Sequence, residues 1–223
     1  MPLRNRVTPE GEIVAHPSKA GMFMGNRGVL HDDAGRIVAP FRHTNWVCCV
    51  TAFKNRRRDL MAPGRYTELF FLDEAVALAA GHRPCGECRR ADYARFRVAW
   101  AAATGADLPA PKEMDSTLHA ARIVPRRRTQ ATFAAAPESL PDGTFVRIAR
   151  GPALILGDRA LPWSPGGYGA PLDRPATGEV EVLTPRPTVA ALAAGYRPVL
   201  HVSAIAALAD EEDVAKRPAE GAH

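Results

Sequence analysis

The chain has 223 residues, of which 46% are hydrophobic and 24% are charged, a composition typical of globular proteins and unlike that of disordered chains. No apolar run reaches the roughly 18 residues needed to span a bilayer. The N-terminus also lacks the apolar core of a signal peptide, so a cytoplasmic protein with no membrane partner is expected. The formal net charge of +5 favours a polyanionic partner.

The segment 43–49 contains three candidate metal ligands, His43, Cys48 and Cys49. Short strands and turns are expected before it, over residues 1–40. Adjacent residues of an extended strand point to opposite faces, so only one of the two cysteines is expected to bind a given metal ion. Cys49 is favoured over Cys48 for that role.

The segment 67–88 predicts a strand, a short helix and a sharp stop in series. Residues 67–72 are mostly apolar, with β-branched and aromatic members, which favours a strand. Asp73 is a good N-cap for a helix over 74–80. Gly81 suits the left-handed residue that ends a helix, and Pro84 prevents the helix from restarting.

Cys85 and Cys88 directly follow this stop and form a Cys-X-X-Cys pair, which points two sulfurs at one position. Structural zinc takes four ligands, so one structural Zn²⁺ would need two more. The pair could also belong to a thioredoxin-like redox site, or the cysteines could be free thiols in a core. The candidates for the remaining ligands are Cys49 or Cys48 as the third, and His43, the other adjacent cysteine, His82 or solvent as the fourth.

The stretch 74–88, Glu-Ala-Val-Ala-Leu-Ala-Ala-Gly-His-Arg-Pro-Cys-Gly-Glu-Cys, resembles the Ada-type metal-binding domain. That domain is the zinc module of bacterial methylphosphotriester-repair proteins and also occurs attached to some nucleases. The resemblance is close over 74–88 and looser over 43–88, and it implies zinc binding and a link to DNA repair. The family holds zinc by four thiolates from two separated cysteine pairs. One of these four thiolates accepts a methyl group. Here the first pair is the adjacent Cys48 and Cys49, so the resemblance supports zinc more than methyl transfer.

A long helix is predicted over 89–104, ending at Gly105, with Tyr93, Phe96, Trp100 and Ala103 on one buried face. Arginines cluster on the predicted outer face of this helix and in two other segments. Such clusters can contact the phosphates of a nucleic acid, although charged runs are more often solvated surface. The expected phosphate-binding residues are Arg56, Arg57, Arg58, Arg89, Arg90, Arg126, Arg127 and Arg128.

Residues 108–112 resemble a linker and mark the expected boundary between two domains. Just beyond it, Asp115 and His119 are four residues apart on a predicted helical face. Such a pair can orient a general base, and with His201 it supplies weak candidates for catalytic residues. The same spacing is also common in surface ion pairs.

The C-terminal half reads as short strands separated by Gly and Pro, over 144–148, 153–156 and 179–183, with one short helix near 188–194. Trp163 and Tyr168 flank a loop and could stack on a base, although core anchoring is expected for Trp163. The sequence Ala-Leu-Ala-Ala-Gly occurs at 77–81 and again at 191–195, each time followed by an aromatic residue, Arg and Pro. Because the second copy has no cysteine after it, this repeated stop does not by itself indicate metal.

These observations predict an α+β fold, with a zinc-ribbon-like α/β module followed by a β-rich half with short helices. The expected division is 1–107 for the zinc-binding module, 108–209 for the β-rich domain and 210–223 for a disordered tail. The leading hypothesis is a zinc-stabilised protein that binds nucleic acid, with DNA as the expected partner and a role in DNA repair. The alternatives are an enzyme, either an alkyl acceptor at the metal or a hydrolase or nuclease using His119, Asp115 and His201, and a zinc-folded protein-interaction module.

Overall fold

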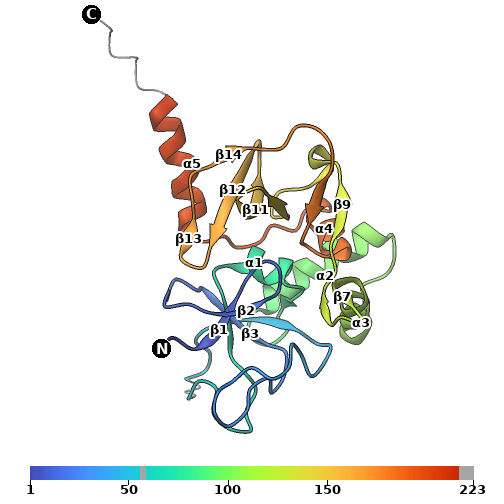
Figure 1. Ribbon diagram of the computed structural model, residues 1–223. Coiled ribbons are helices and arrows are strands. Elements are labelled where there is room, and N and C mark those ends of the chain that lie inside the picture. The colour runs from blue at the N-terminus through green and yellow to red at the C-terminus, as the bar shows by residue number, and fades with distance from the viewer. Residues whose placement is uncertain (56–58, 216–223) are drawn as a thin grey trace, which may run out of the picture.

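The computed structural model describes residues 1–55 and 59–215, with side chains described as far as 209. The expected phosphate contacts at Arg56, Arg57 and Arg58 therefore lie outside the described residues. The architecture is mixed α+β, as predicted from the sequence (Figure 1). The helices are α1 Glu74–Ala79, α2 Arg90–Thr104, α3 Pro111–Arg122, α4 Arg186–Ala193, α5 Val202–Ala215 and the short 3-10 helix Pro137–Ser139.

The strands form two larger sheets and one hairpin. The first sheet has the order β2-β1-β5-β3-β4-β6, and the second has the order β13-β12-β11-β10-β15-β9, with β14 paired to β12. The hairpin is β7-β8. The strand bounds are β1 Arg4–Val7, β2 Ile13–Ala15, β3 Phe23–Asn26, β4 Val47–Val50, β5 Leu69–Phe71, β6 Arg83–Pro84, β7 Ile123–Val124, β8 Thr129–Gln130, β9 Phe133–Ala135, β10 Phe145–Ile148, β11 Gly151–Leu156, β12 Arg159–Ser164, β13 Gly167–Tyr168, β14 Leu172–Asp173 and β15 Val180–Val182.

The start and the stop of α1 follow the local sequence signals. The Asp73 carboxylate accepts a hydrogen bond from the backbone N–H of Val76 at 3.0 Å, so Asp73 is the predicted N-cap. Gly81 has a φ of 80°, the left-handed conformation that favours glycine. A Cβ at Gly81 would also clash with the side chain of Arg122. The chain therefore turns sharply into β6, which leads directly to Cys85.

The repeated Ala-Leu-Ala-Ala-Gly segment ends a helix in both places. Gly195, with a φ of 101°, follows α4 as Gly81 follows α1. The aromatic residue after the second glycine has a packing role: Tyr196 is buried, and its hydroxyl donates a hydrogen bond of 2.6 Å to Glu74 Oε1. The second copy therefore braces the start of α1, which carries the first copy.

One hydrophobic cluster joins the two sheets. Helix α1 lies between them in Figure 1, and its buried Val76 packs in the same cluster as Phe71 of the first sheet and Leu154 of the second. Ala204 of α5 belongs to this cluster as well. The segments before and after the boundary expected near 108 thus share a core, and α5 continues through Ala215, into the segment 210–223.

A second cluster is formed by the helices beside the sheets. Phe96 and Trp100 of α2 pack there with Met114 of α3 and Leu192 of α4. The predicted buried face of α2 is confirmed for Phe96 and Trp100, whereas Ala103 is exposed and Ala99 takes its place in the core. Helix α4 contacts α2 on the side of Ala99, and the sequence period of α2 does not reveal where its neighbouring helix lies.

Trp163 and Tyr168 are held by the core. Trp163 is partly buried against the main cluster, and Tyr168 is buried with its hydroxyl donating to Asp73 Oδ2 at 2.8 Å. Both rings are therefore engaged by the protein itself. No helix among residues 1–55 and 59–215 is long and apolar enough to cross a membrane.

Candidate metal centre

Strand pairing brings the two cysteine segments together. Strands β4 and β6 run parallel, with Val47 opposite Arg83 and Cys48 opposite Pro84. The backbone N–H of Cys85 continues this pairing by donating to the Cys48 carbonyl at 3.0 Å. Cys85 therefore begins its turn beside the end of β4, on which Cys49 lies.

Three sulfurs converge at this point. The Sγ atoms of Cys49, Cys85 and Cys88 all lie within 4.8 Å of one another, close enough to bind a single metal ion. All three side chains are half-buried. Strand alternation predicted that only one of Cys48 and Cys49 would bind, and the structure places Cys49 with the other two sulfurs. Cys48 points away into the core and is fully buried.

The three thiols also contact one another. A hydrogen bond from Cys49 is the largest influence on Cys85 and lowers the pKa of the Cys85 thiol to about 5. The same hydrogen bond, followed by burial, raises the pKa of Cys49. Burial is the main cause of the raised pKa of Cys88. The hydrogen bonds among the sulfurs thus favour a thiolate at Cys85.

A cavity of about 210 Å³ adjoins the sulfurs. Cys49 and Cys88 form part of its wall, together with the apolar side chains of Met24 and Phe70. Glu68 also lines it, buried and accepting a hydrogen bond from the Met61 backbone N–H at 2.8 Å. Three sulfurs leave one position of a four-coordinate metal ion for a further ligand.

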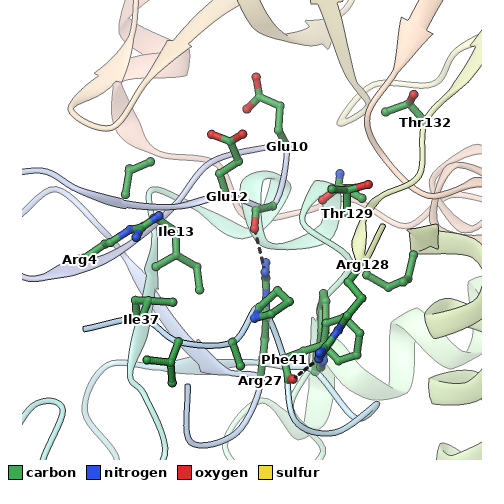
Figure 2. A pocket seen from close by; sticks show the side chains of 18 of the residues that line it. Arg4, Glu10, Glu12, Ile13, Arg27, Ile37, Phe41, Arg128, Thr129 and Thr132 are labelled. Carbon is green, nitrogen blue, oxygen red and sulfur yellow. Dashed lines mark hydrogen bonds between the residues drawn. The ribbon is translucent and has the colours of Figure 1, made fainter. Parts of the chain in front are cut away.

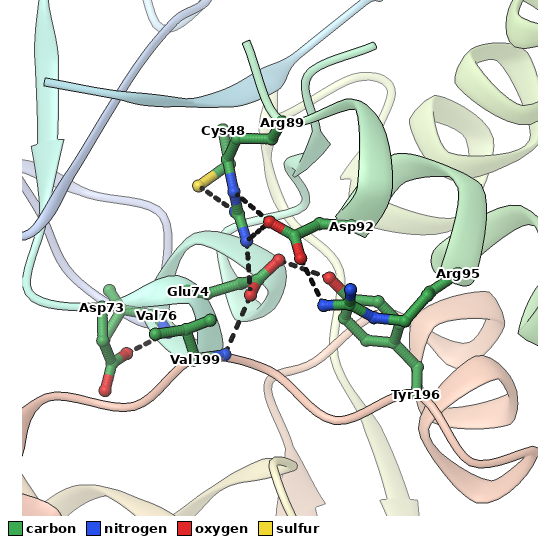
Figure 3. Close-up of polar contacts among 9 residues, drawn as sticks. All are labelled: Cys48, Asp73, Glu74, Val76, Arg89, Asp92, Arg95, Tyr196 and Val199. Atoms are coloured by element: carbon green, nitrogen blue, oxygen red, sulfur yellow. Dashed lines mark hydrogen bonds and ion pairs between the residues drawn. The ribbon is translucent and has the colours of Figure 1, made fainter. Parts of the chain in front are cut away.

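Cys48 is connected to a buried ion-pair network instead of the sulfur cluster (Figure 3). Arg89 donates from Nη1 to Cys48 Sγ at 3.3 Å. Its Nη2 lies 2.8 Å from both Glu74 Oε2 and Asp92 Oδ2. Burial opposes the charge of Arg89, but the hydrogen bond to Glu74 and the neighbouring anions raise the pKa of its guanidinium. Arg89 is only 4% exposed, so it is unable to contact phosphate at the surface.

Neither candidate histidine belongs to the sulfur cluster. His43 Nε2 contacts Asn26 Oδ1 at 3.0 Å, and its backbone carbonyl accepts from Trp46 Nε1 at 2.8 Å. His82 is fully buried and packs against Phe71 and Trp46, with ring centroids 4.6 and 5.2 Å apart. Both ring nitrogens of His82 lack a hydrogen-bond partner in the described part of the protein.

His82 should make the stability of the protein depend on pH. Burial, and then the charges of Arg27 and Arg122, depress the pKa of folded His82 well below 6.5. The unfolded chain takes up this proton near pH 6.5 and the folded chain does not, so stability is complete above that pH and falls below it. We expect a loss of about 1.4 kcal/mol per pH unit from this group. Comparing urea midpoints between about pH 7.5 and 5.5 should show a smaller loss in His82→Phe than in the natural chain, and equal losses would contradict the assignment.

The three weak candidates for catalysis do not form a site. Asp115 is bound to Arg83 by two hydrogen bonds, of 2.7 and 2.8 Å, and both residues are buried. His119 Nδ1 contacts Arg122 at 3.1 Å, and His201 Nδ1 contacts Ser203 at 2.8 Å. Within the described ranges, none of these contacts joins Asp115, His119 and His201 to one another.

The remaining predicted phosphate-binding residues are exposed. Arg90 opens α2, two residues after Cys88. Arg126, Arg127 and Arg128 lie in the turn between β7 and β8. Arg128 stacks on the ring of Phe41 at 4.5 Å and donates to the Phe41 carbonyl at 3.0 Å. None of the four makes an ion pair with a described residue.

Sequence reasoning missed a group of buried arginines around Trp46. The guanidinium of Arg27 lies 4.3 Å from the Trp46 ring, and that of Arg122 lies 3.7 Å from it. Burial lowers the pKa of Arg27 to about 9 and that of Arg122 to about 8, so both stay charged at neutral pH. Arginine is rarely buried without a partner, and no periodicity marked these positions in the sequence.

Comparison of the chain with family models, with curated proteins and with solved structures found no match.

Proposed function

We propose that the chain is a zinc-stabilised protein that binds nucleic acid. The observation that carries the proposal is the convergence of three cysteine sulfurs at one point. Under this proposal the ion is Zn²⁺, and the segment around it acts as an Ada-like, zinc-ribbon-like module. A link to DNA repair rests on the resemblance of 74–88 alone.

The donor set suits zinc. Soft thiolate ligands select zinc, copper(I) or iron–sulfur clusters over hard cations such as magnesium. Cys49, Cys85 and Cys88 would hold the ion, and a water molecule or a group in the adjoining cavity would complete four-coordination. Bound zinc would tie the end of β4 to the turn before α2, two segments far apart in sequence. This is a structural role.

The exposed arginines support the nucleic-acid part of the proposal. A surface arginine that already pairs with a carboxylate has little to gain from a phosphate, but Arg90 and Arg126–128 have no such partner in the described chain. Arg128 is also held in place by Phe41, which reduces the entropy lost when it binds. The formal net charge of +5 agrees with a polyanionic partner.

Binding to DNA should depend steeply on salt and on the β7–β8 turn. Replacing Arg126, Arg127 and Arg128 by Ala removes up to three phosphate contacts. The plot of log affinity against log salt should then become shallower by roughly 2 to 3. Fluorescence anisotropy with a labelled random DNA duplex at several salt concentrations measures this slope. Arg150→Ala, which removes one exposed arginine from another turn, is the control and should change the slope by about 1 or less.

An unchanged slope and affinity in the triple variant would show that the turn is only solvated surface. The same metal-loaded protein, incubated with methylated DNA and weighed intact, distinguishes binding from alkyl transfer. We expect no gain in mass, because the proposed site is structural. A gain of one methyl group on Cys49, Cys85 or Cys88 would instead make the metal-thiolate alkyl acceptor the better proposal.

A further inference from the structure

A cavity of about 650 Å³ opens where the first sheet, the β7–β8 hairpin and the second sheet meet (Figure 2). Ile13 and Ile37 form part of its apolar wall, Phe41 and Arg128 stand at one side, and Arg147 reaches it from β10. The volume is within the range of small-molecule sites. No cysteine lines this cavity, so what it binds is independent of the metal centre.

Arg27 is the unusual residue of this cavity. It directly follows β3, is 3% exposed and points among the lining residues in Figure 2. Its Nη1 donates to the Gly11 carbonyl at 2.8 Å, but its Nε and Nη2 have no hydrogen-bond partner in the described chain. Leaving buried donors of a charged group without acceptors is costly, so a missing acceptor is expected here.

The other three buried arginines of the described chain all have more hydrogen-bond or ion-pair partners than Arg27. Arg83 is paired with Asp115, and Arg89 with Glu74 and Asp92. Arg122 has no ion pair in the described chain but donates to the carbonyls of Gly81 and Thr44. Arg27 alone among the four has neither a carboxylate nor a second carbonyl among the described residues.

The local charge shows which kind of acceptor is missing. Arg122 is influenced by the charges of Arg27, Arg83 and Asp115, so these four groups form one neighbourhood. Asp115 is paired with Arg83, so Arg27 and Arg122 are left without an ion pair to a described carboxylate. A phosphate monoester, which carries about −1.5 to −2 at neutral pH, offers negative charge and several acceptor oxygens to Arg27.

The rim and the wall fit a phosphate attached to an organic group. Arg4 and Arg128 add positive charge to the lining, while Arg147 is already occupied by Glu10 and Glu181 at 3.2 and 2.7 Å. Glu10, Glu12 and Glu181 line the cavity as well, and Glu12 is exposed, as are Arg4 and Arg128. The apolar wall offers nothing to a bare inorganic ion, but it can bury the carbon skeleton of a larger ligand.

We propose that this cavity binds a small organic phosphate monoester, with the phosphate on Arg27 and the organic part against the apolar wall. Such a ligand satisfies the free donors of Arg27 and offsets the excess of buried positive charge. The inference goes beyond the proposed nucleic-acid function, since it concerns a small molecule and a different set of residues, apart from Arg128.

The test is calorimetric titration of the metal-loaded full chain at fixed ionic strength, with a nucleoside 5′-monophosphate, inorganic phosphate and acetate as separate probes. We expect one site per chain, with affinity decreasing in that order. Arg27→Met should weaken binding of the monophosphate about 10- to 100-fold, the usual effect of losing hydrogen bonds to a charged group. Arg150→Met, which removes an exposed arginine outside the cavity, should bind as the natural chain does.

The melting temperature tests whether the Arg27→Met variant is still folded. Because Met fills a similar volume without an unpaired charge, the ligand-free Arg27→Met protein should melt at the same temperature as the natural chain or higher. The monophosphate should raise the melting temperature of the natural chain only. The proposal is overturned if no probe binds at millimolar concentration, if Arg27→Met binds as well as the natural chain, or if the monophosphate binds no better than inorganic phosphate.

Discussion

Cys85→Ser should remove the metal ion from the protein and lower its thermal stability. The natural chain is expected to contain about one zinc per chain by elemental analysis, and the variant little or none, because the cluster in the described part of the chain has three sulfurs and the variant loses one. In small zinc domains the metal contributes about 10 kcal/mol or more to folding. A smaller share is expected here, since much of the fold rests on hydrophobic clusters away from the sulfurs.

The adjacent cysteines provide a matched control for this prediction. Cys49→Ala should lose the metal as Cys85→Ser does, whereas Cys48→Ala should keep it, since Cys48 faces Arg89 and the core. A chelator should lower the melting temperature of the natural chain and of Cys48→Ala, and leave that of Cys85→Ser unchanged. Retention of zinc by Cys49→Ala together with its loss from Cys48→Ala would refute the assignment of ligands.

Asp115→Ala should destabilise the protein by about 3–5 kcal/mol, the usual result of leaving one partner of a buried ion pair without the other. Arg83 would lose both of its hydrogen bonds to the carboxylate, and Arg122 would lose the favourable influence of the Asp115 charge. This is a large part of the 5–15 kcal/mol that typically holds a protein folded. The midpoint of urea unfolding measures the effect.

The double variant Arg83→Met with Asp115→Leu separates the charge effect from loss of packing. Replacing both partners by apolar side chains should recover much of the stability that Asp115→Ala loses. Equal stability of Asp115→Ala and the natural chain would argue against a structural role. In that case the carboxylate would again be a candidate for catalysis, with His119 as its partner at i, i+4.

Local signals in the sequence were enough for the elements around the cysteines. Asp73 and Gly81 define the two ends of α1, and the apolar run before Asp73 forms β5. Local signals could not predict the parallel pairing of β4 with β6, because no local pattern encodes which strands meet. The helix α5 and the strand β12 were not anticipated, because Ala-rich and Pro-containing segments match no single period.

The candidate metal site was predictable to the extent that its residues carry a recognisable spacing. Cys85 and Cys88 form a motif, and strand alternation shows that only one of Cys48 and Cys49 can join them. Which of the two does so depends on the face that β4 turns toward Cys85, which the structure gives. Arg89 shows the limit of this reasoning: its place in a run of charges suggests a surface residue, but its ion pair with Glu74 holds it in the core. Burial of a charge depends on a partner distant in sequence, which no window of neighbouring residues reveals.

The core shared by the two sheets has a consequence for synthesis of the chain. The N-terminal sheet leaves the ribosome first, but its cluster includes Leu154, Leu183 and Ala204, which emerge much later. Until then, apolar side chains such as Phe71 remain without their final neighbours. Contacts between residues so distant in sequence slow folding and prolong the exposure of partly folded chains to aggregation. The cysteine segments, 49 and 85–88, come together earlier in the sequence, so a metal ion bound there could hold the first sheet while the remainder of its core is being made.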